Sequence, residues 1–355
     1  MIFNWRDIKN PAAGGAERYI HELAKRLTID SKVTLFTPEF KGCKDREIID
    51  GVEVVRKGGR YTVYIEALKM YQRKFKGKYD LVIDSINTVP FFTPLFVKEP
   101  RLTIFYQMSK EFWLKSFKFP FNIIGYLIEP WYLRLYKKEK VITISESSRE
   151  DLENLGFQDI EIVNPGIDVK PLNKNLKKEK DLTLISFSRL VKPKRIDHVI
   201  RAFEIINRNI PKSKLWILSD GPGKDDLKDL VKELGLENSV EFFGFVDEKK
   251  KIELIHRSHY HLFTSVREGW GIVVVEAALN GTPTIGYDVP GIRDSVSKMG
   301  GFLVGEDYEE LAKKVIELSD SDSSSSNKIN IDRIRDFDWN KIYKDFKGIV
   351  DESVS

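Results

Sequence analysis

The sequence has almost no cysteine and no long apolar run. Its 355 residues include one cysteine, Cys43, which excludes a disulfide framework and a zinc site built on several cysteines. No apolar stretch approaches the roughly 20 residues of a membrane-spanning helix, and the N-terminus lacks the apolar segment of a signal peptide. The five histidines form no metal-ligand pattern. We therefore expect a cytoplasmic protein without a metal site.

The composition is that of a folded protein with two domains. Apolar residues make up 41% of the chain and charged residues 32%, a balance typical of globular rather than disordered proteins. At about 150 residues per domain, the length predicts two domains, each large enough to form its own core.

Short apolar runs alternate with helical patterns in both halves of the chain. Such alternation predicts parallel sheets with crossover helices. A stretch rich in Lys and Asn at the end of residues 163–180 interrupts the pattern, so we place the domain linker there. Strands are expected at residues 31–37, 79–84, 140–145, 182–187, 214–218, 240–243, 260–263 and 284–286. Helices are expected at residues 16–27, 147–155 (capped by Ser147), 196–206, 227–234 and 339–350.

This organisation predicts an α/β protein of two Rossmann-like parallel-sheet domains that face each other across a cleft. We place the first domain at residues 1–166 and the second at residues 167–335, followed by a C-terminal helix at 336–355. Ligands of such sheets bind beyond the carboxyl ends of the strands. A cleft between two such domains is therefore the expected position of a site.

The strongest motif comes directly after an expected strand of the second domain. It contains Glu268, Gly269, Trp270, Gly271 and Glu276. The two glycines allow a ligand to approach the backbone closely, and the N-terminus of the helix that begins there favours a phosphate. Glu276 lies within an otherwise apolar helix, where its carboxylate needs hydrogen-bond donors. Sugar hydroxyls would supply them, and so would a structural Arg or Lys.

Two further motifs contain groups that suit an anion. Arg189 and Lys194 follow the first expected strand of the second domain, and a planar guanidinium together with a point charge suits a diphosphate. The alternative interpretation is that these two cations belong to a solvent-exposed basic turn that binds no ligand. Gly14 and Gly15 precede the first expected helix, whose N-terminus is again an anion site, although this signal is weak by itself.

Together these residues resemble the retaining glycosyltransferases of family GT4, which have the GT-B fold. Glu268 and Glu276 match the Glu-x7-Glu motif of that family. Arg189 and Lys194 match its Arg and Lys pair, five residues apart. Residues 14–17 match its first glycine loop. The resemblance covers nearly the whole chain.

The resemblance implies a hexosyltransferase that uses a nucleotide-diphosphate sugar as donor, retains anomeric configuration and needs no metal or other cofactor. Glu268, Arg189 and Lys194 would be the catalytic residues. Glu268 would face the transferred sugar, and the Arg and Lys would hold the diphosphate together with backbone N–H groups at Gly15. Glu276 would hold the ribose of the nucleotide.

The sequence departs from the family pattern at two positions. Tyr106 stands where many members have a histidine near the donor sugar, and Arg195 replaces the usual glycine after Lys194. We assign Tyr106 and Asp84 to the acceptor or donor-sugar side. The alternatives are an epimerase or phosphorylase on the same fold and, in view of Tyr106, a non-catalytic subunit that binds nucleotide sugars. An Asp-x-Asp at 320–322 lies in a Ser-rich stretch and is interpreted as linker.

Positive charge and aromatic residues gather in residues 97–140. Nine Lys and Arg against four acids give this segment a net charge of +5, and eleven aromatic residues lie between positions 105 and 136. Such interleaving favours an anionic membrane surface, and so a lipid-linked acceptor or a growing glycan. The alternative is that the rings are core and the lysines ordinary surface; nucleic acid is disfavoured. The expected membrane-inserted residues are Trp113, Phe117, Phe119 and Phe121.

Overall fold

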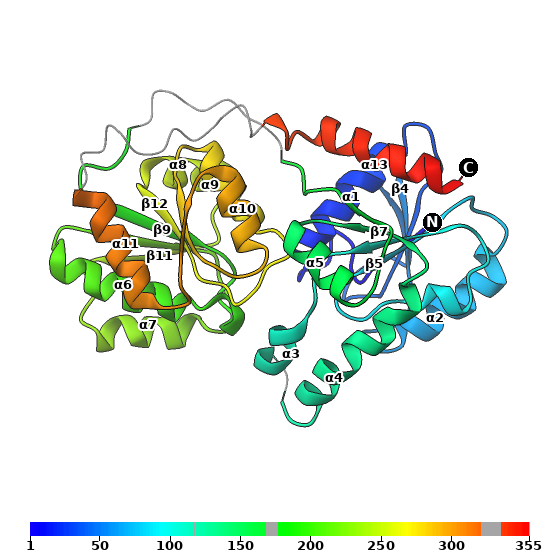
Figure 1. The fold of residues 1–355 in the computed structure, drawn as a ribbon, viewed down its shortest axis with the longest axis horizontal. Coiled ribbons are helices and arrows are strands. Elements are labelled where there is room, and N and C mark those ends of the chain that lie inside the picture. Colours follow the sequence, from blue (N-terminus) through cyan, green and yellow to red (C-terminus); the bar gives the residue numbers. More distant parts are fainter. Residues whose placement is uncertain (117, 168–176, 321–334, 355) are drawn as a thin grey trace. The chain divides into compact units, whose positions relative to one another are not determined.

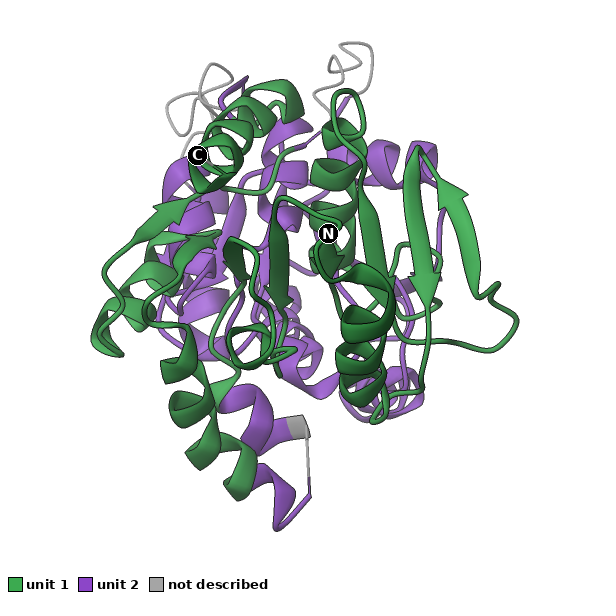
Figure 2. Cartoon of the chain, turned by 90° about the vertical axis from the view of Figure 1, so that its right-hand side faces the viewer, with its two compact units in different colours: residues 1–110, 123–166, 337–355 green, residues 111–122, 167–336 purple. Residues whose placement is uncertain are grey.

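The structure is a computed structural model that describes residues 1–116, 118–167, 177–320 and 335–354 (Figure 1). The chain divides into two compact units (Figure 2). Unit 1 contains residues 1–110, 123–166 and 337–355, and unit 2 contains residues 111–122 and 167–336. The short segment 111–122, which we placed in the first domain, therefore groups with unit 2.

Unit 1 is built on a sheet of eight strands in the described part of the chain, in the order β3-β4-β2-β1-β5-β6-β7-β8. Only the pair β3 and β4 is antiparallel. Strands β2 and β5 are buried at every position, because helices cover both faces of the sheet. The strands are β1 (Ile2–Phe3), β2 (Thr34–Thr37), β3 (Arg46–Ile49), β4 (Val52–Arg56), β5 (Val82–Ile86), β6 (Arg101–Phe105), β7 (Lys140–Thr143) and β8 (Ile160–Ile162).

The last helix of the chain, α13, packs against the first helix of unit 1, α1. The Trp339 ring lies 6.2 Å from the Tyr19 ring, and the Arg26 guanidinium lies 5.2 Å from its centroid. A Cβ atom on Gly166 would come within 2.5 Å of the Trp339 ring, so only glycine fits there. The helices of unit 1 are α1 (Gly15–Leu27), α2 (Val63–Met70), α4 (Phe121–Leu133), α5 (Glu146–Asn154) and α13 (Trp339–Val354), although the first two residues of α4 group with unit 2. Helix α3 (Lys110–Ser116) groups with unit 2 except for its first residue.

Unit 2 contains a parallel sheet of six strands in its described residues, in the order β11-β10-β9-β12-β13-β14. β9 is the first of them in the chain, and the strand order reverses between β9 and β12, where ligands of doubly wound sheets bind. The strands are β9 (Thr183–Phe187), β10 (Lys214–Leu218), β11 (Val240–Gly244), β12 (Tyr260–Phe263), β13 (Thr284–Tyr287) and β14 (Phe302–Val304). The helices are α6 (Ile196–Asn209), α7 (Lys224–Glu233), α8 (Glu248–Arg257), α9 (Ile272–Leu279), α10 (Ile292–Met299) and α11 (Tyr308–Asp320).

The two parallel-sheet units confirm the predicted fold class, and all eight predicted strands are present: β10 and β12 have the predicted bounds, and the other six have shifted ends. One cap was wrong. Helix α5 begins after Ser145, whose extended backbone lets its hydroxyl accept the backbone N–H of Ser148, so Ser147 lies inside the first turn. Strands β3, β4, β8 and β14 are among those not predicted: β8 and β14 have three residues each and β3 is half-exposed, whereas β4 is buried at four of its five positions. Of the Asp-x-Asp, only Asp320 lies among the described residues.

Candidate functional site

The two strongest motifs of the sequence meet at the carboxyl edge of the unit 2 sheet. The Nζ atom of Lys194, in a short 3-10 turn after β9, pairs with the Glu268 carboxylate in the loop after β12. The Thr264 hydroxyl, at the end of β12, donates to the backbone oxygens of Lys194 and Arg195 at 3.0 and 2.8 Å. The strand reversal therefore brings a predicted cation and a predicted carboxylate into contact.

The charges at this edge remain accessible. The Lys194 and Glu268 side chains are 21% and 16% exposed, so their ion pair lies at the surface of the site rather than in the core. Arg189 is exposed, and its guanidinium makes no hydrogen bond or ion pair with the described residues. An incoming anion can therefore bind Arg189 directly but must separate or bridge the Lys194–Glu268 pair.

Glu276 has a structural lysine partner, which was one of the two alternatives left open by the sequence. Its Oε1 atom lies 3.2 Å from Nζ of Lys251 on α8, which also pairs with Glu248 at 3.0 Å. The Glu276 side chain is 15% exposed. The structural alternative for Glu276 is thus realised, and the carboxylate still has accessible surface for a second donor. No sequence signal marks Lys251, because α8 carries several lysines and only the packing of α8 beside α9 selects one.

The glycines shape the loop between β12 and α9. Gly271 has φ +81°, and a Cβ atom there would lie 2.9 Å from the Phe263 ring. A Cβ atom on Gly291 would lie 2.0 Å from the Glu268 carbonyl oxygen and 3.0 Å from the carbonyl carbon of Gly269. Side chains are therefore excluded where these two loops touch. Trp270, which we predicted at the donor site, is buried, so its side chain packs inside unit 2 rather than facing solvent.

Helix α1 begins at the predicted glycine loop of unit 1. The Gly14 N–H donates to the Glu17 carboxylate at 2.7 Å, and the Asn87 amide donates to the same side chain at 3.4 Å. Gly15 is exposed, and a Cβ atom there would meet no atom within 4 Å. The loop is therefore fixed by Glu17, with open space in front of Gly15.

Tyr106 and Asp84 are engaged inside unit 1. The Tyr106 hydroxyl lies 3.0 Å from the Ser85 hydroxyl and donates to the Ala16 carbonyl at 3.3 Å. Burial raises the pKa of Tyr106. Asp84 is 1% exposed and accepts hydrogen bonds from Tyr136 at 2.5 Å and from the Thr93 hydroxyl at 3.0 Å, while burial raises its pKa. We therefore leave both residues out of the site proposed below.

No cluster of three or more His, Cys, Asp or Glu that could hold a metal ion occurs among the described residues. The charged groups described above at the carboxyl edge of unit 2 include the Lys194–Glu268 ion pair and the exposed guanidinium of Arg189. They are suited to binding and stabilising an anion.

Two family models match consecutive parts of the chain. The model described as "Glycosyltransferase Family 4" matches residues 13–170, and the model described as "Glycosyl transferases group 1" matches residues 170–333. The chain is a GT-B glycosyltransferase of family 4. The predicted family is therefore confirmed, and the motif residues of unit 2 lie within the second matched region.

Individual relatives are distant. The glycogen synthase of Mycobacterium tuberculosis is 26% identical over 225 residues, which are 61% of this chain and 54% of that protein. The alpha-monoglucosyldiacylglycerol synthase of Streptococcus pneumoniae is 30% identical over 136 residues, 38% of this chain and 31% of that protein. The chain thus spans about half the length, or less, of these curated relatives.

Solved structures show the same fold over the whole chain. The Anabaena protein HepE, solved in complex with UDP-glucose, has 17% identity and a TM-score of 0.73, covering 99% of this chain and 98% of that one. At this identity the likeness establishes the GT-B fold alone.

Proposed function

We propose that this glycosyltransferase transfers a hexose from a nucleotide-diphosphate sugar to an acceptor hydroxyl with retention of configuration. The observation that carries the proposal is the contact of Lys194 with Glu268 at the strand reversal of unit 2, with Arg189 on the same loop after β9. The UDP-glucose bound to HepE supports this class of donor.

The cations act on the leaving group. Breaking the bond between the anomeric carbon and the diphosphate oxygen places charge on the diphosphate, which Arg189 and Lys194 stabilise by fixed positive charge. The acceptor oxygen forms the new bond on the same face of the sugar, and its proton passes to the leaving phosphate. Glu268 faces the transferred sugar, Glu276 holds the ribose, and the backbone N–H of Gly15 donates to the diphosphate.

The donor must replace an existing contact. Lys194 and Glu268 neutralise each other in the structure, so a diphosphate that binds Lys194 frees the Glu268 carboxylate to accept sugar hydroxyls. Both groups thereby exchange one partner for another when the donor binds. This exchange limits the free-energy cost of desolvating the two charged groups on binding, because neither charge is left unpaired.

A binding screen of UDP-, GDP- and ADP-sugars by calorimetry tests the proposal. One nucleotide class should bind, and product analysis with an acceptor should show glycosyl transfer. Turnover of the donor without an acceptor would favour an epimerase, consumption of phosphate a phosphorylase, and binding without turnover a non-catalytic subunit. Failure of every nucleotide sugar to bind would overturn the proposal.

We expect the reaction to survive chelation of divalent metals. The diphosphate charge is met by Arg189 and Lys194, so no metal ion is required to neutralise it. Activity measured with excess EDTA should equal activity with added Mg²⁺ within about twofold. A strict requirement for Mg²⁺ or Mn²⁺ would contradict the assignment of these two side chains.

The two glutamates should respond differently to substitution. Glu268→Gln should lower kcat by about tenfold and change donor affinity less, since the carboxylate interacts with the reacting sugar. Glu276→Ala should weaken binding of the free nucleoside diphosphate by about tenfold, the effect of losing one hydrogen bond to a charged group. Glu248→Ala is the matched control, because it removes the other partner of Lys251. Normal nucleotide binding by Glu276→Ala would exclude the ribose role.

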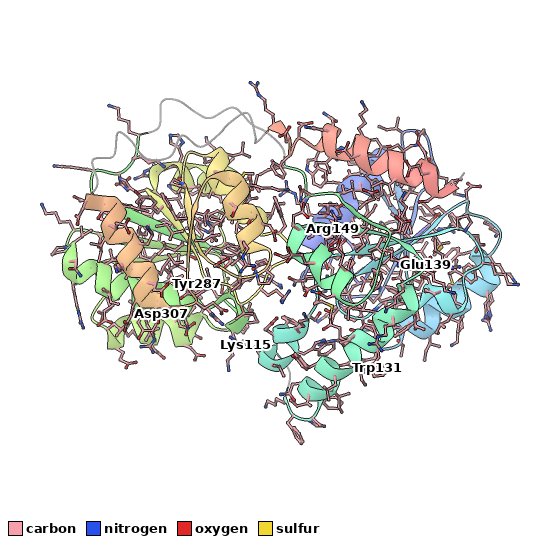
Figure 3. All side chains as sticks on the ribbon, in the orientation of Figure 1. Lys115, Trp131, Glu139, Arg149, Tyr287 and Asp307 are labelled. Atoms are coloured by element: carbon pink, nitrogen blue, oxygen red, sulfur yellow. The ribbon has the colours of Figure 1, made fainter. Side chains whose placement is uncertain are left out.

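We further propose that the acceptor is lipid-linked or presented at an anionic membrane. The aromatic segment divides in the structure: Phe105, Tyr106 and Tyr136 are buried, whereas Phe119, Phe121 and Trp131 are 82%, 68% and 68% exposed. Trp113 is half-buried, and Phe117 lies outside the described residues. Figure 3 shows Trp131 on α4. The exposed apolar residues of α4 are Phe121, Ile123, Ile124, Tyr126, Leu127, Ile128 and Trp131.

This surface has the composition of an interfacial segment. An apolar surface of this extent is unusual on a free-standing domain and marks a site of interaction. Exposed cations lie at both its ends, Lys118 before α4 and Arg134 after it, the latter 4.7 Å from the Trp131 ring. Glu129 holds α4 in place by accepting the Ser109 N–H at 2.6 Å, and burial raises its pKa to about 7. No helix in the described ranges is long and apolar enough to cross a membrane.

A further inference from the structure

Arg195 has a backbone conformation that is rare for its residue type. Its φ of 48° and ψ of 46° lie in the left-handed region, and it is the residue directly before α6. Side chains with a Cβ atom disfavour this region, which glycine enters freely. Arginine also lacks the short polar side chain with which asparagine or aspartate stabilises it. The surrounding structure must therefore hold Arg195 in place.

The side chain of Arg195 is held by two residues from neighbouring strands. Its Nη1 atom lies 2.7 Å from Oε2 of Glu306, which follows β14. Its guanidinium lies 5.8 Å from the ring centroid of Tyr287, the last residue of β13. Tyr287 is labelled in Figure 3. The Arg195 side chain is only 15% exposed. An ion pair and a cation–π contact thus anchor it from one side.

The backbone of Arg195 is held from the other side. Its carbonyl oxygen accepts the Thr264 hydroxyl at 2.8 Å and the His198 N–H at 3.0 Å, and its own N–H donates to the Lys192 carbonyl at 3.1 Å. The same Thr264 hydroxyl contacts the carbonyl of Lys194. The anchoring of Arg195 therefore fixes the turn of residues 192–195 as a unit.

We propose that Arg195 is a positioning residue for donor binding: its side chain, tied to Glu306 and Tyr287, holds the turn in the conformation that presents Lys194 to the diphosphate. Arg195 does not itself touch the donor. The proposal rests on the diphosphate role of Lys194 given above. A cation that is fixed before binding loses less conformational entropy when the ligand arrives, so the anchor raises affinity.

Three variants separate the anchor from the backbone conformation. Arg195→Gly keeps the left-handed conformation available and removes the anchor. Arg195→Ala removes the anchor but still places a residue with a Cβ atom in the left-handed backbone region, so the cost of that backbone conformation remains. Glu306→Gln leaves Arg195 intact and removes the ionic partner. Each is titrated calorimetrically with UDP, GDP and ADP, its melting temperature is measured, and kcat and donor KM are determined with the sugar of the nucleotide that binds.

We expect Arg195→Gly to weaken nucleotide binding about tenfold and to raise donor KM in proportion, with kcat and the melting temperature close to those of the wild type. Arg195→Ala should bind as weakly and also melt at a lower temperature. Glu306→Gln should weaken binding about threefold. A residue that serves only the stability of the fold would lower the melting temperature without changing KM.

Asp50→Gly is the matched control. Asp50 is also left-handed, with φ 49°, and its side chain is also paired, 2.9 Å from His21 in unit 1. This variant should bind nucleotide with unchanged affinity. Wild-type affinity in both Arg195→Gly and Glu306→Gln would overturn the positioning role.

Lys194→Ala distinguishes the two proposals. If it binds weakly while Arg195→Gly binds normally, the positioning role fails and the diphosphate role stands. If Lys194→Ala also binds normally, the diphosphate role fails and the positioning role fails with it. Should Arg195→Gly not fold, Glu306→Gln decides, because it leaves the backbone of the turn unchanged.

Discussion

Lys194→Ala will weaken binding of the nucleotide-diphosphate sugar by up to about a hundredfold. Losing a hydrogen bond to a charged group costs about 1.5–3 kcal/mol, which is about ten- to a hundredfold in affinity. The upper end is expected here because Lys194 neutralises Glu268, and its removal leaves that carboxylate unpaired where the diphosphate binds. Arg189→Ala should weaken binding less, since Arg189 is exposed and compensates no neighbouring carboxylate.

The double variant Lys194→Ala/Glu268→Gln tests the physical cause. If repulsion by the uncompensated carboxylate contributes, the double variant will bind the free nucleoside diphosphate more tightly than Lys194→Ala alone. The changes in binding free energy of the two single variants will then not add up to that of the double variant. Lys192→Ala is the control, as an exposed lysine of the same turn, and should bind normally. Wild-type affinity in both Lys194→Ala and Arg189→Ala would refute the assignment of the diphosphate to this edge.

Replacing Phe119, Phe121, Leu127 and Trp131 together by serine will lower the affinity of the protein for anionic vesicles by about a hundredfold or more. Each large apolar side chain that leaves water contributes about 1.5–3 kcal/mol when fully buried, and partial insertion of four still exceeds the 2.7 kcal/mol of a hundredfold change. Binding of the wild type should weaken as salt rises, because each Lys or Arg near an anionic surface contributes about 1 kcal/mol that is screened. Cosedimentation with vesicles of graded anionic lipid content measures both effects.

The exposure of these four residues separates insertion from core packing. All four are highly exposed, so the quadruple variant should keep its melting temperature and its affinity for the nucleotide. Ile48→Ser/Tyr61→Ser is the control, because these residues are 75% and 79% exposed elsewhere in unit 1 and should not affect vesicle binding. If the intact protein does not bind anionic vesicles at low salt, the membrane proposal is excluded and a soluble acceptor is favoured.

Local pattern was sufficient for the fold class. Buried parallel strands are apolar at nearly every position, and helices such as α1 repeat apolar residues at helical spacing, so both are visible in a short window of sequence. Half-exposed elements such as β3 and β8 carry no such pattern. The start of α5 was misjudged for a related reason. Three serines, at positions 145, 147 and 148, occur where that helix begins, and only the end of β7 determines that Ser145 is the cap.

The sequence by itself determined which residue types occur at the proposed site. Glycines that admit no Cβ, cations that follow β9 and carboxylates that follow β12 all lie in motifs that can be found without coordinates. It could not tell a ligand-facing polar group from an internally satisfied one. Tyr106 directly follows β6 and Asp84 lies within β5, yet both make hydrogen bonds to other residues of unit 1.

Only the tertiary structure decided the partners of the charged groups. Lys194 finds Glu268 across the strand reversal, Glu276 finds Lys251 on another helix, and Arg195 finds Glu306 beyond β14. The separation along the chain ranges from 25 positions for Lys251 and Glu276 to 111 positions for Arg195 and Glu306. A charge–charge contact leaves no periodicity in the sequence, because it depends on the distance between two side chains after the strands have been ordered in the sheet.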